Sequence, residues 1–188
     1  GVRGYELVRL IADHPEVEVA ALCDLDKGRL DAACRMVEEV TGRRPEAYTG
    51  DEYAYRKLLE RDDLEAVMVN TPIEWHVPMA VDAMKAGKDV GSEVTAGHEL
   101  DGLWELVRTK EATGRRYMLL ENYIYTPHNM MVLRMAQEGV FGLPYYGECS
   151  YIHDCRNLRF TADGTLTWRG RSVRDEYGNS YATHSLGP

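Results

Sequence analysis

The sequence predicts an α/β protein with a doubly wound parallel sheet, followed by the start of a second, α+β domain with a mainly antiparallel sheet. Two observations carry this prediction. Short β-branched runs and stretches of helical periodicity alternate five times before Gly139, and no hairpin signal separates them. After Pro144 the pattern changes to an alternating run over 145–154 and then to a polar stretch over 156–180, which indicates a different domain.

The helices are recognised by apolar residues three or four apart and by a residue that stops each helix. Leu7, Leu10 and Ile11 share one helical face, and Pro15 ends that first helix. Glycines such as Gly42 and Gly114 follow later helices, where they can close a helix in the left-handed conformation. The predicted helices are 5–13, 27–40, 51–60, 76–86, 99–113 and 127–138.

The strands are short apolar runs between these helices. The run 17–23 stops at Asp24, and the run 65–70 ends at Thr71 and Pro72. Runs without polar alternation are typical of parallel strands that are buried on both faces. The predicted strands are 17–23, 46–49, 65–70, 88–93 and 116–121.

The composition argues against several classes of protein. The 188 residues carry 31 acidic and 22 basic side chains, a formal net charge of −9, which speaks against general binding to nucleic acid or to anionic membranes. No run approaches the roughly 20 apolar residues of a membrane-spanning helix. The four cysteines form no C-x-x-C pair, so we expect neither a disulfide framework nor a metal site, and we interpret Cys23 as a small core residue.

The first residues fit part of a nucleotide-binding turn. Gly1 and Gly4 match the second and third glycines of G-x-G-x-x-G, directly before an amphipathic helix, where backbone N–H groups approach a pyrophosphate. Asp24 ends the next strand, 20 residues after Gly4, where a carboxylate accepts the ribose hydroxyls. Its charge would repel a 2′-phosphate, so NAD is favoured over NADP. The alternative is a helix-opening glycine with a turn aspartate.

Polar residues also end the later strands: Asn70, Glu93, and Glu121 with Asn122. Because the carboxyl ends of parallel strands meet at one edge, where ligands bind, we expect these residues to lie together. We place a domain boundary near 122–126, with a Rossmann-type NAD-binding domain over 1–123 and the start of a substrate-binding, catalytic domain over 124–188.

The chain begins at Gly1 without an initiator Met, and we expect it to be part of a longer protein whose first strand precedes that residue. Any export signal would also precede Gly1, so the compartment stays open. Without a central strand the chain is expected to fold poorly alone.

Two segments, 70–76 (NTPIEWH) and 87–93 (GKDVGSE), resemble the Gfo/Idh/MocA family of nicotinamide-dependent oxidoreductases. That family usually has Glu-Lys-Pro where this chain has Glu93, Val94 and Thr95, and its Lys serves hydride transfer.

Val94 in the place of that lysine is similar to one branch of the family, the NAD-dependent α-N-acetylgalactosaminidases of glycoside hydrolase family 109. Further segments that are similar to this branch are 120–122 (LEN), 147–154 (GECSYIHD), 168–169 (WR) and 178–188 (GNSYATHSLGP). The branch typically has Pro and Gly where this chain has Ala182 and Ser185. The resemblance covers the whole chain.

The resemblance implies a set of site residues by position. Contacts with NAD are expected from Val2, Arg3, Gly4, Asp24, Asn70, Glu74, Trp75, His76, Glu93, Val94, Asn122 and Tyr181. Contacts with the sugar are expected from Tyr151, Arg169, Tyr181, Ala182, Thr183 and His184. Catalytic roles are expected for Tyr151, Tyr181 and His184.

The chemistry implied by this branch differs from ordinary glycosidase chemistry, which places two carboxylates across the scissile bond. The sugar loses a hydride from C3 to NAD, eliminates its aglycone, adds water and recovers the hydride, so NAD is bound tightly and regenerated. Tyr151 would remove the C2 proton, provided that a nearby positive charge lowers its pKa. His184 would take and return the proton of the C3 hydroxyl. No metal is required.

Two other functions stay open. A sugar or cyclitol dehydrogenase would use His184 in place of the missing lysine and would accumulate NADH. A non-enzymatic protein would hold NAD without turnover. His153 with Asp154 is an alternative catalytic pair. The expected partner is a small glycoside, and a homo-oligomer is plausible for the complete protein.

Overall fold

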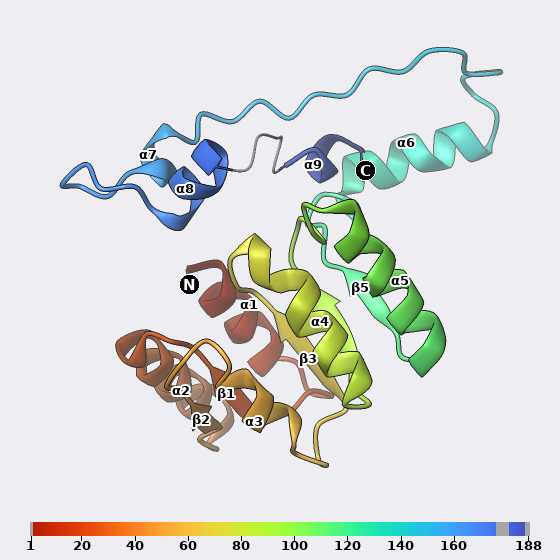
Figure 1. The fold of residues 1–188 in the computed structure, drawn as a ribbon. Helices are drawn as coiled ribbons and strands as arrows, with labels where there is room; N and C mark the ends of the chain where they lie inside the picture. Colours follow the sequence, from red (N-terminus) through yellow and green to blue (C-terminus); the bar gives the residue numbers. More distant parts are fainter. Residues whose placement is uncertain (1, 176–180, 187–188) are drawn as a thin grey trace.

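Helices and parallel strands alternate through the first 120 residues of the computed structural model, which describes residues 2–175 and 181–186 (Figure 1). The elements are, in order, α1 (Val2–Ala12), β1 (Ala21–Cys23), α2 (Lys27–Thr41), β2 (Glu46–Tyr48), α3 (Tyr55–Leu59), β3 (Ala66–Val69), the 3₁₀ turn η1 (Ile73–Trp75), α4 (His76–Lys85), β4 (Asp89–Ser92), α5 (Leu100–Thr113) and β5 (Tyr117–Leu119). Then follow α6 (Pro127–Gln137), α7 (Arg156–Arg159), α8 (Trp168–Asp175) and α9 (Thr183–Leu186).

All strand pairs are parallel, and they form two groups. β1 pairs with β2, while β3, β4 and β5 form a three-stranded sheet in that order. The predicted α/β class with parallel sheets is therefore confirmed. Because the three strands run in one direction, the residues that follow β3, β4 and β5 reach the same edge of the sheet.

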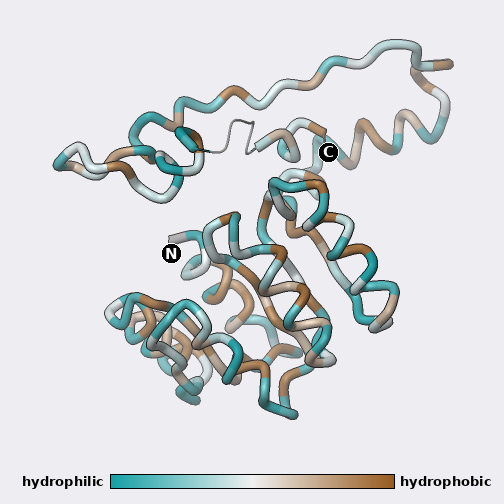
Figure 2. The backbone as a smooth tube through the Cα atoms, viewed as in Figure 1, coloured by the Kyte–Doolittle hydropathy of each residue, from teal (hydrophilic) through white to brown (hydrophobic). Residues whose placement is uncertain are grey.

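Helices α4 and α5 lie side by side over the sheet of β3, β4 and β5, and hydrophobic residues recur along these elements (Figures 1 and 2). Helix α1 packs with α2 through Ala12, Met36 and Val37. Gly42 and Gly114 close α2 and α5 with φ of 74° and 66°, a conformation that favours glycine, so both predicted helix stops are confirmed. No helix in the described ranges has the length and apolar character needed to cross a bilayer.

Several local predictions are wrong. The predicted helix 51–60 is helical only over Tyr55–Leu59, because the Asp51 carboxylate accepts the N–H of Tyr53 and holds a turn instead. Cys23 is exposed and is no core residue. Strand β3 is not buried on both faces, since Ala66 and Met68 are exposed.

The alternating run 145–154 is no strand either. It runs as an extended trace above the sheets, and the described residues offer it no neighbouring strand (Figure 1). Side-chain alternation fits a strand, but a strand forms only when a second segment supplies backbone hydrogen bonds.

Within the described residues, β1 and β3 each have one edge without a strand partner. Unpaired N–H and C=O groups along such an edge can add a strand from another molecule. We therefore expect residues 1–188, expressed alone, to self-associate in size-exclusion chromatography with light scattering. A monomer with a well-dispersed amide NMR spectrum would contradict this expectation.

The core tyrosine Tyr55 makes the free energy of unfolding depend on pH in the alkaline range. Its hydroxyl donates to Asp82 Oδ2 at 2.7 Å, and burial, followed by this carboxylate, raises the pKa of Tyr55 to about 12. A phenol whose pKa is higher in the folded state stabilises the fold below its ordinary value of 10, and this contribution is lost as the pH rises toward 12.

We expect the free energy of unfolding of the intact protein, measured with urea, to fall as the pH rises above 10, the ordinary pKa of a phenol. Tyr55→Phe should weaken this dependence, whereas Tyr53→Phe, at an exposed neighbour, should leave it unchanged. Equal slopes in wild type and Tyr55→Phe would refute the assignment.

Candidate active site

The carboxyl edge of the sheet of β3, β4 and β5 gathers the polar residues that end its strands, among them Asn70, Glu93 and Glu121. Helix α1 begins beside the same edge. A methyl group added at Gly4 would lie 3.3 Å from Asn70 Cβ, so the helix and the end of β3 approach closely at this glycine. Gly1, the other glycine of the predicted turn, lies outside the described residues.

An ion pair crosses this edge. Arg3 Nε donates to Glu93 Oε1 at 2.9 Å, and the second oxygen of Glu93 accepts the N–H of Val94 at 3.3 Å. The Glu93 side chain is 12% exposed and that of Arg3 is 44% exposed, so the pair lies at the surface of the edge with its carboxylate turned inward. The structure thus brings together three residues for which NAD contacts are predicted.

Two buried oxygens at the end of β3, Asn70 Oδ1 and Thr71 Oγ1, have no hydrogen-bond partner within the described residues. A buried polar atom without a partner is unfavourable, so such atoms point to a ligand or water. Asn70 lies beside the first turn of α1, whose free backbone N–H groups favour an anion. These residues fit the pyrophosphate and ribose of a dinucleotide.

The other side chains predicted to contact NAD are either exposed or in contact with other groups of the protein. Asp24 follows β1, outside the three-stranded sheet, and its Oδ1 accepts the N–H of Asp26 at 2.9 Å. Glu74 and Asn122 are exposed. Trp75 packs edge-on against Tyr53, with ring centroids 5.7 Å apart. The side chain of Val2 lies outside the part of the chain that the structure describes.

A second group of polar side chains forms where α9 meets the end of β5. His184 Nδ1 lies 2.8 Å and 3.1 Å from the two carboxylate oxygens of Glu121. The Glu121 side chain is 0% exposed and that of His184 is 7% exposed. Glu121 Oε1 also accepts the N–H of Tyr123 at 3.1 Å. Because an ionised carboxylate only accepts, Nδ1 carries the hydrogen, and the neutral ring then presents a bare Nε2.

Three tyrosine rings surround this histidine. The rings of Tyr181 and His184 stack at 5.6 Å with 6° between their planes, and the Tyr151 ring lies 4.6 Å from His184. Tyr123 meets the histidine edge-on at 5.5 Å. Arg169 Nε donates to Tyr181 Oη at 2.7 Å. The structure therefore brings together four of the residues predicted to bind sugar, from segments far apart in the sequence.

The surroundings of Tyr151 differ from those expected. Burial, and then the neighbouring Tyr123, raises the pKa of Tyr151, whereas the predicted role needs a lower value. Its Oη lies 3.0 Å from His153 Nδ1. The alternative pair of His153 with Asp154 is not observed, because Asp154 binds Arg156 through both carboxylate oxygens.

The last predicted segment is only partly described. Thr183 Oγ1 is buried and has no hydrogen-bond partner within the described residues, while the carbonyl of Ala182 accepts the Ser185 hydroxyl at 3.1 Å. The positions 178–180 and 187–188 of the motif lie outside those residues. No cluster of three or more metal-ligating side chains occurs within 2–175 and 181–186.

The sequence marks Glu121 as the end of a strand and as part of the family-like segment 120–122, but it does not predict that Glu121 is a partner of the site. Glu121 and His184 are 63 positions apart, and no spacing rule joins them. The available signal was local: a carboxylate follows a predicted strand at a sheet edge where other strands also end in polar residues.

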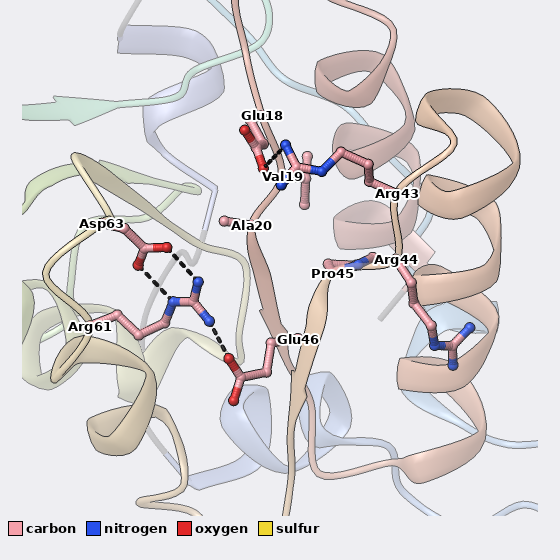
Figure 3. A pocket seen from close by; sticks show the side chains of 9 residues that line it. All are labelled: Glu18, Val19, Ala20, Arg43, Arg44, Pro45, Glu46, Arg61 and Asp63. Carbon is pink, nitrogen blue, oxygen red and sulfur yellow. Dashed lines mark hydrogen bonds and ion pairs between the residues drawn. The ribbon is translucent and has the colours of Figure 1, made fainter.

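A polar cavity of about 230 Å³ lies elsewhere, at the amino ends of β1 and β2 (Figure 3). Arg43 pairs there with Glu18 at 2.7 Å, and Arg61 binds Asp63 and Glu46. Because the arginines that line it already have carboxylate partners, this cavity offers little to a substrate, and the carboxyl edge remains the candidate site.

The chain is similar to several known proteins. Residues 125–188 match the model of the glycosyl hydrolase 109 C-terminal domain. The chain is 39% identical over 189 aligned positions to a glycosyl hydrolase family 109 protein of Shewanella woodyi, covering all of this chain and 40% of that protein. It is 36% identical to an α-N-acetylgalactosaminidase of Shewanella oneidensis, covering 41% of it. The chain thus spans about two fifths of the length of these relatives.

Solved structures show the same fold. Scyllo-inositol dehydrogenase of Lactobacillus casei with bound NAD(H) and scyllo-inositol superposes with a TM-score of 0.65 at 18% identity, over 76% of this chain and 40% of that one. The WlbA dehydrogenase of Bordetella pertussis, solved with NADH and UDP-GlcNAcA, gives 0.62 at 22% identity, over 76% and 41%. The resemblance predicted from the sequence motifs is therefore confirmed: this chain has the Rossmann-type fold of the Gfo/Idh/MocA dehydrogenases, and along its whole length it is similar to glycosyl hydrolase family 109 proteins.

Proposed function

We propose that this chain is part of an NAD-dependent glycoside hydrolase that acts on α-linked N-acetylgalactosamine. The observation that carries the proposal is the pair of His184 with the buried Glu121, surrounded by Tyr151 and Tyr181 at the carboxyl edge of the sheet. The relative named α-N-acetylgalactosaminidase supports the choice of sugar. In this proposal residues 1–123 hold NAD, and residues 124–188 begin the domain that holds the sugar.

NAD, when bound, supplies a reversible acceptor for a hydride from a carbinol carbon. The first turn of α1 and Arg3 would hold its pyrophosphate, and the oxygens of Asn70 and Thr71 would gain their missing partners from it. Asp24 would accept the ribose hydroxyls. Glu93 and Val94, which follow β4 at the same edge, complete the proposed set.

His184 is the proposed base for the sugar hydroxyl at C3. With its Nδ1 hydrogen donated to Glu121, its Nε2 is free to take the hydroxyl proton and later return it. The carboxylate of Glu121 stabilises the imidazolium that forms, and because this carboxylate is fully buried, no water competes for that interaction.

Tyr151 is the proposed acid–base group at C2. Its raised pKa favours the neutral phenol, so the hydroxyl needs an acceptor for its proton when it acts as a base. His153 Nδ1, 3.0 Å from the phenol oxygen, supplies that acceptor. Tyr181, Arg169, Ala182 and Thr183 orient the sugar, and the partnerless hydroxyl of Thr183 is suited to bond a sugar oxygen.

The test is the stoichiometry of the intact protein with a chromogenic α-N-acetylgalactosaminide. A hydrolase releases the aglycone over many turnovers while the absorbance of NADH stays constant, since the hydride returns to the sugar. A sugar or cyclitol dehydrogenase would accumulate one NADH for each sugar oxidised and release no aglycone, and that result would overturn the proposal.

A further inference from the structure

His76 occupies an unusual position for a residue that was expected to contact NAD directly. It begins α4 and is 1% exposed, which makes it one of the most deeply buried side chains of the described residues. Nδ1 lies 2.6 Å from the carbonyl oxygen of Thr95, and Nε2 lies 2.9 Å from the carbonyl oxygen of Thr71. The ring thus spans the two loops that follow β3 and β4.

The two carbonyl partners determine how many hydrogens the ring nitrogens must carry. A backbone carbonyl oxygen only accepts hydrogen bonds, so each ring nitrogen needs a hydrogen to bond to the carbonyl that faces it. A neutral imidazole has one such hydrogen, and its bare nitrogen would face the lone pairs of the second carbonyl. The imidazolium has two and can donate to both carbonyls at once.

We infer that His76 is a buried, doubly protonated positioning residue that fastens the loop after β3 to the loop after β4. The inference rests on the proposed function, because these loops hold Asn70 and Thr71 on one side and Glu93 and Val94 on the other. His76 does not touch the nucleotide in this role. It fixes the separation of two loops that must contact the nucleotide together.

Two features near the ring of His76 bear on its charge. The amino end of α4 and the burial of the ring both disfavour a cation, and hydrogen bonds from both ring nitrogens to the two carbonyls offset this cost. The Glu93 carboxylate is held by Arg3 and by the N–H of Val94, so the carbonyls of Thr71 and Thr95 remain the partners of the ring.

The ring can be observed without any assay of turnover. In the intact protein with ¹⁵N-labelled histidine and without NAD, long-range ¹H–¹⁵N NMR at neutral pH is expected to show hydrogen on both ring nitrogens of His76. The signal is assigned by its loss in His76→Gln, or in His76→Asn if the first variant does not fold. A bare ring nitrogen in the wild-type protein would overturn the inference.

Hydrogen exchange tests whether His76 joins the loop after β3 to the loop after β4. In hydrogen exchange, His76→Gln is expected to speed amide exchange both in 71–75 and in 93–97, whereas His14→Gln, at an exposed histidine, leaves both segments unchanged. Faster exchange in only one segment would contradict a link between them. The affinity for NAD, measured by calorimetry, should fall about tenfold in His76→Gln, the effect of one lost buried hydrogen bond.

These readouts separate the two hypotheses. If the wild-type protein binds no NAD but both ring nitrogens carry hydrogen and both loops are protected, the proposed function fails and the positioning role of His76 is supported. If NAD binds and His76→Gln leaves its affinity unchanged, the positioning role fails and the proposed function stands.

Discussion

Replacing His184 by Gln is expected to lower kcat/KM for an α-N-acetylgalactosaminide by about 10²- to 10⁴-fold, the range typical of a lost general base. Gln fills similar space and can still donate to Glu121, but its amide cannot take a proton from a sugar hydroxyl. Because the proposed role of the ring is toward the sugar, the affinity for NAD should stay close to that of the wild-type protein.

The measurement is aglycone release by the intact protein, together with calorimetric titration of NAD. His14→Gln is the matched control, since His14 is an exposed histidine that follows α1. Near-normal turnover in His184→Gln would remove this residue from the catalytic group. Equal losses in both variants would indicate a general effect on folding.

Glu121→Gln is expected to cost about 10²-fold or more in kcat with little change in KM, by analogy with other carboxylates that hold a catalytic histidine. The amide keeps the shape of the side chain but removes the buried charge that stabilises the imidazolium of His184. It can also donate to Nδ1, which would turn the ring to the wrong tautomer.

The pH profile distinguishes this role from a structural one. Loss of a neighbouring negative charge disfavours the protonated ring, so the acid limb of kcat/KM should move to lower pH in Glu121→Gln. Glu121→Asp should recover part of the activity. Glu138→Gln, at an exposed glutamate paired with Arg134, should behave like the wild-type protein. An unchanged profile in Glu121→Gln would contradict the proposed coupling.

Most of the fold was accessible from periodicity. The helices α2, α4, α5 and α6 lie within one or two residues of their predicted bounds, because their apolar spacing and their stops are local properties. The strands were found for the same reason, although they are shorter than predicted. The failures, at 51–54 and 145–154, are places where a turn-forming aspartate or the lack of a neighbouring strand outweighs side-chain pattern.

The candidate site divides in the same way. Residues such as Asn70 and Glu93 were predictable, since parallel strands bring their carboxyl ends to one edge without further information. The partners of these residues could not be predicted from the sequence. The sequence does not reveal that Arg3 pairs with Glu93. It also does not reveal that the Tyr151 hydroxyl lies beside His153, or that burial raises the pKa of Tyr151.

The sequence by itself determined the α/β class, the order of its elements and the resemblance to family 109, because these depend on local pattern and on motifs read in order. Only the tertiary structure decided that Glu121 holds His184 and that His76 spans two loops between backbone carbonyls. Both arrangements join segments that are distant along the chain. Packing places them together, and the strength of such polar contacts depends on the burial that packing creates.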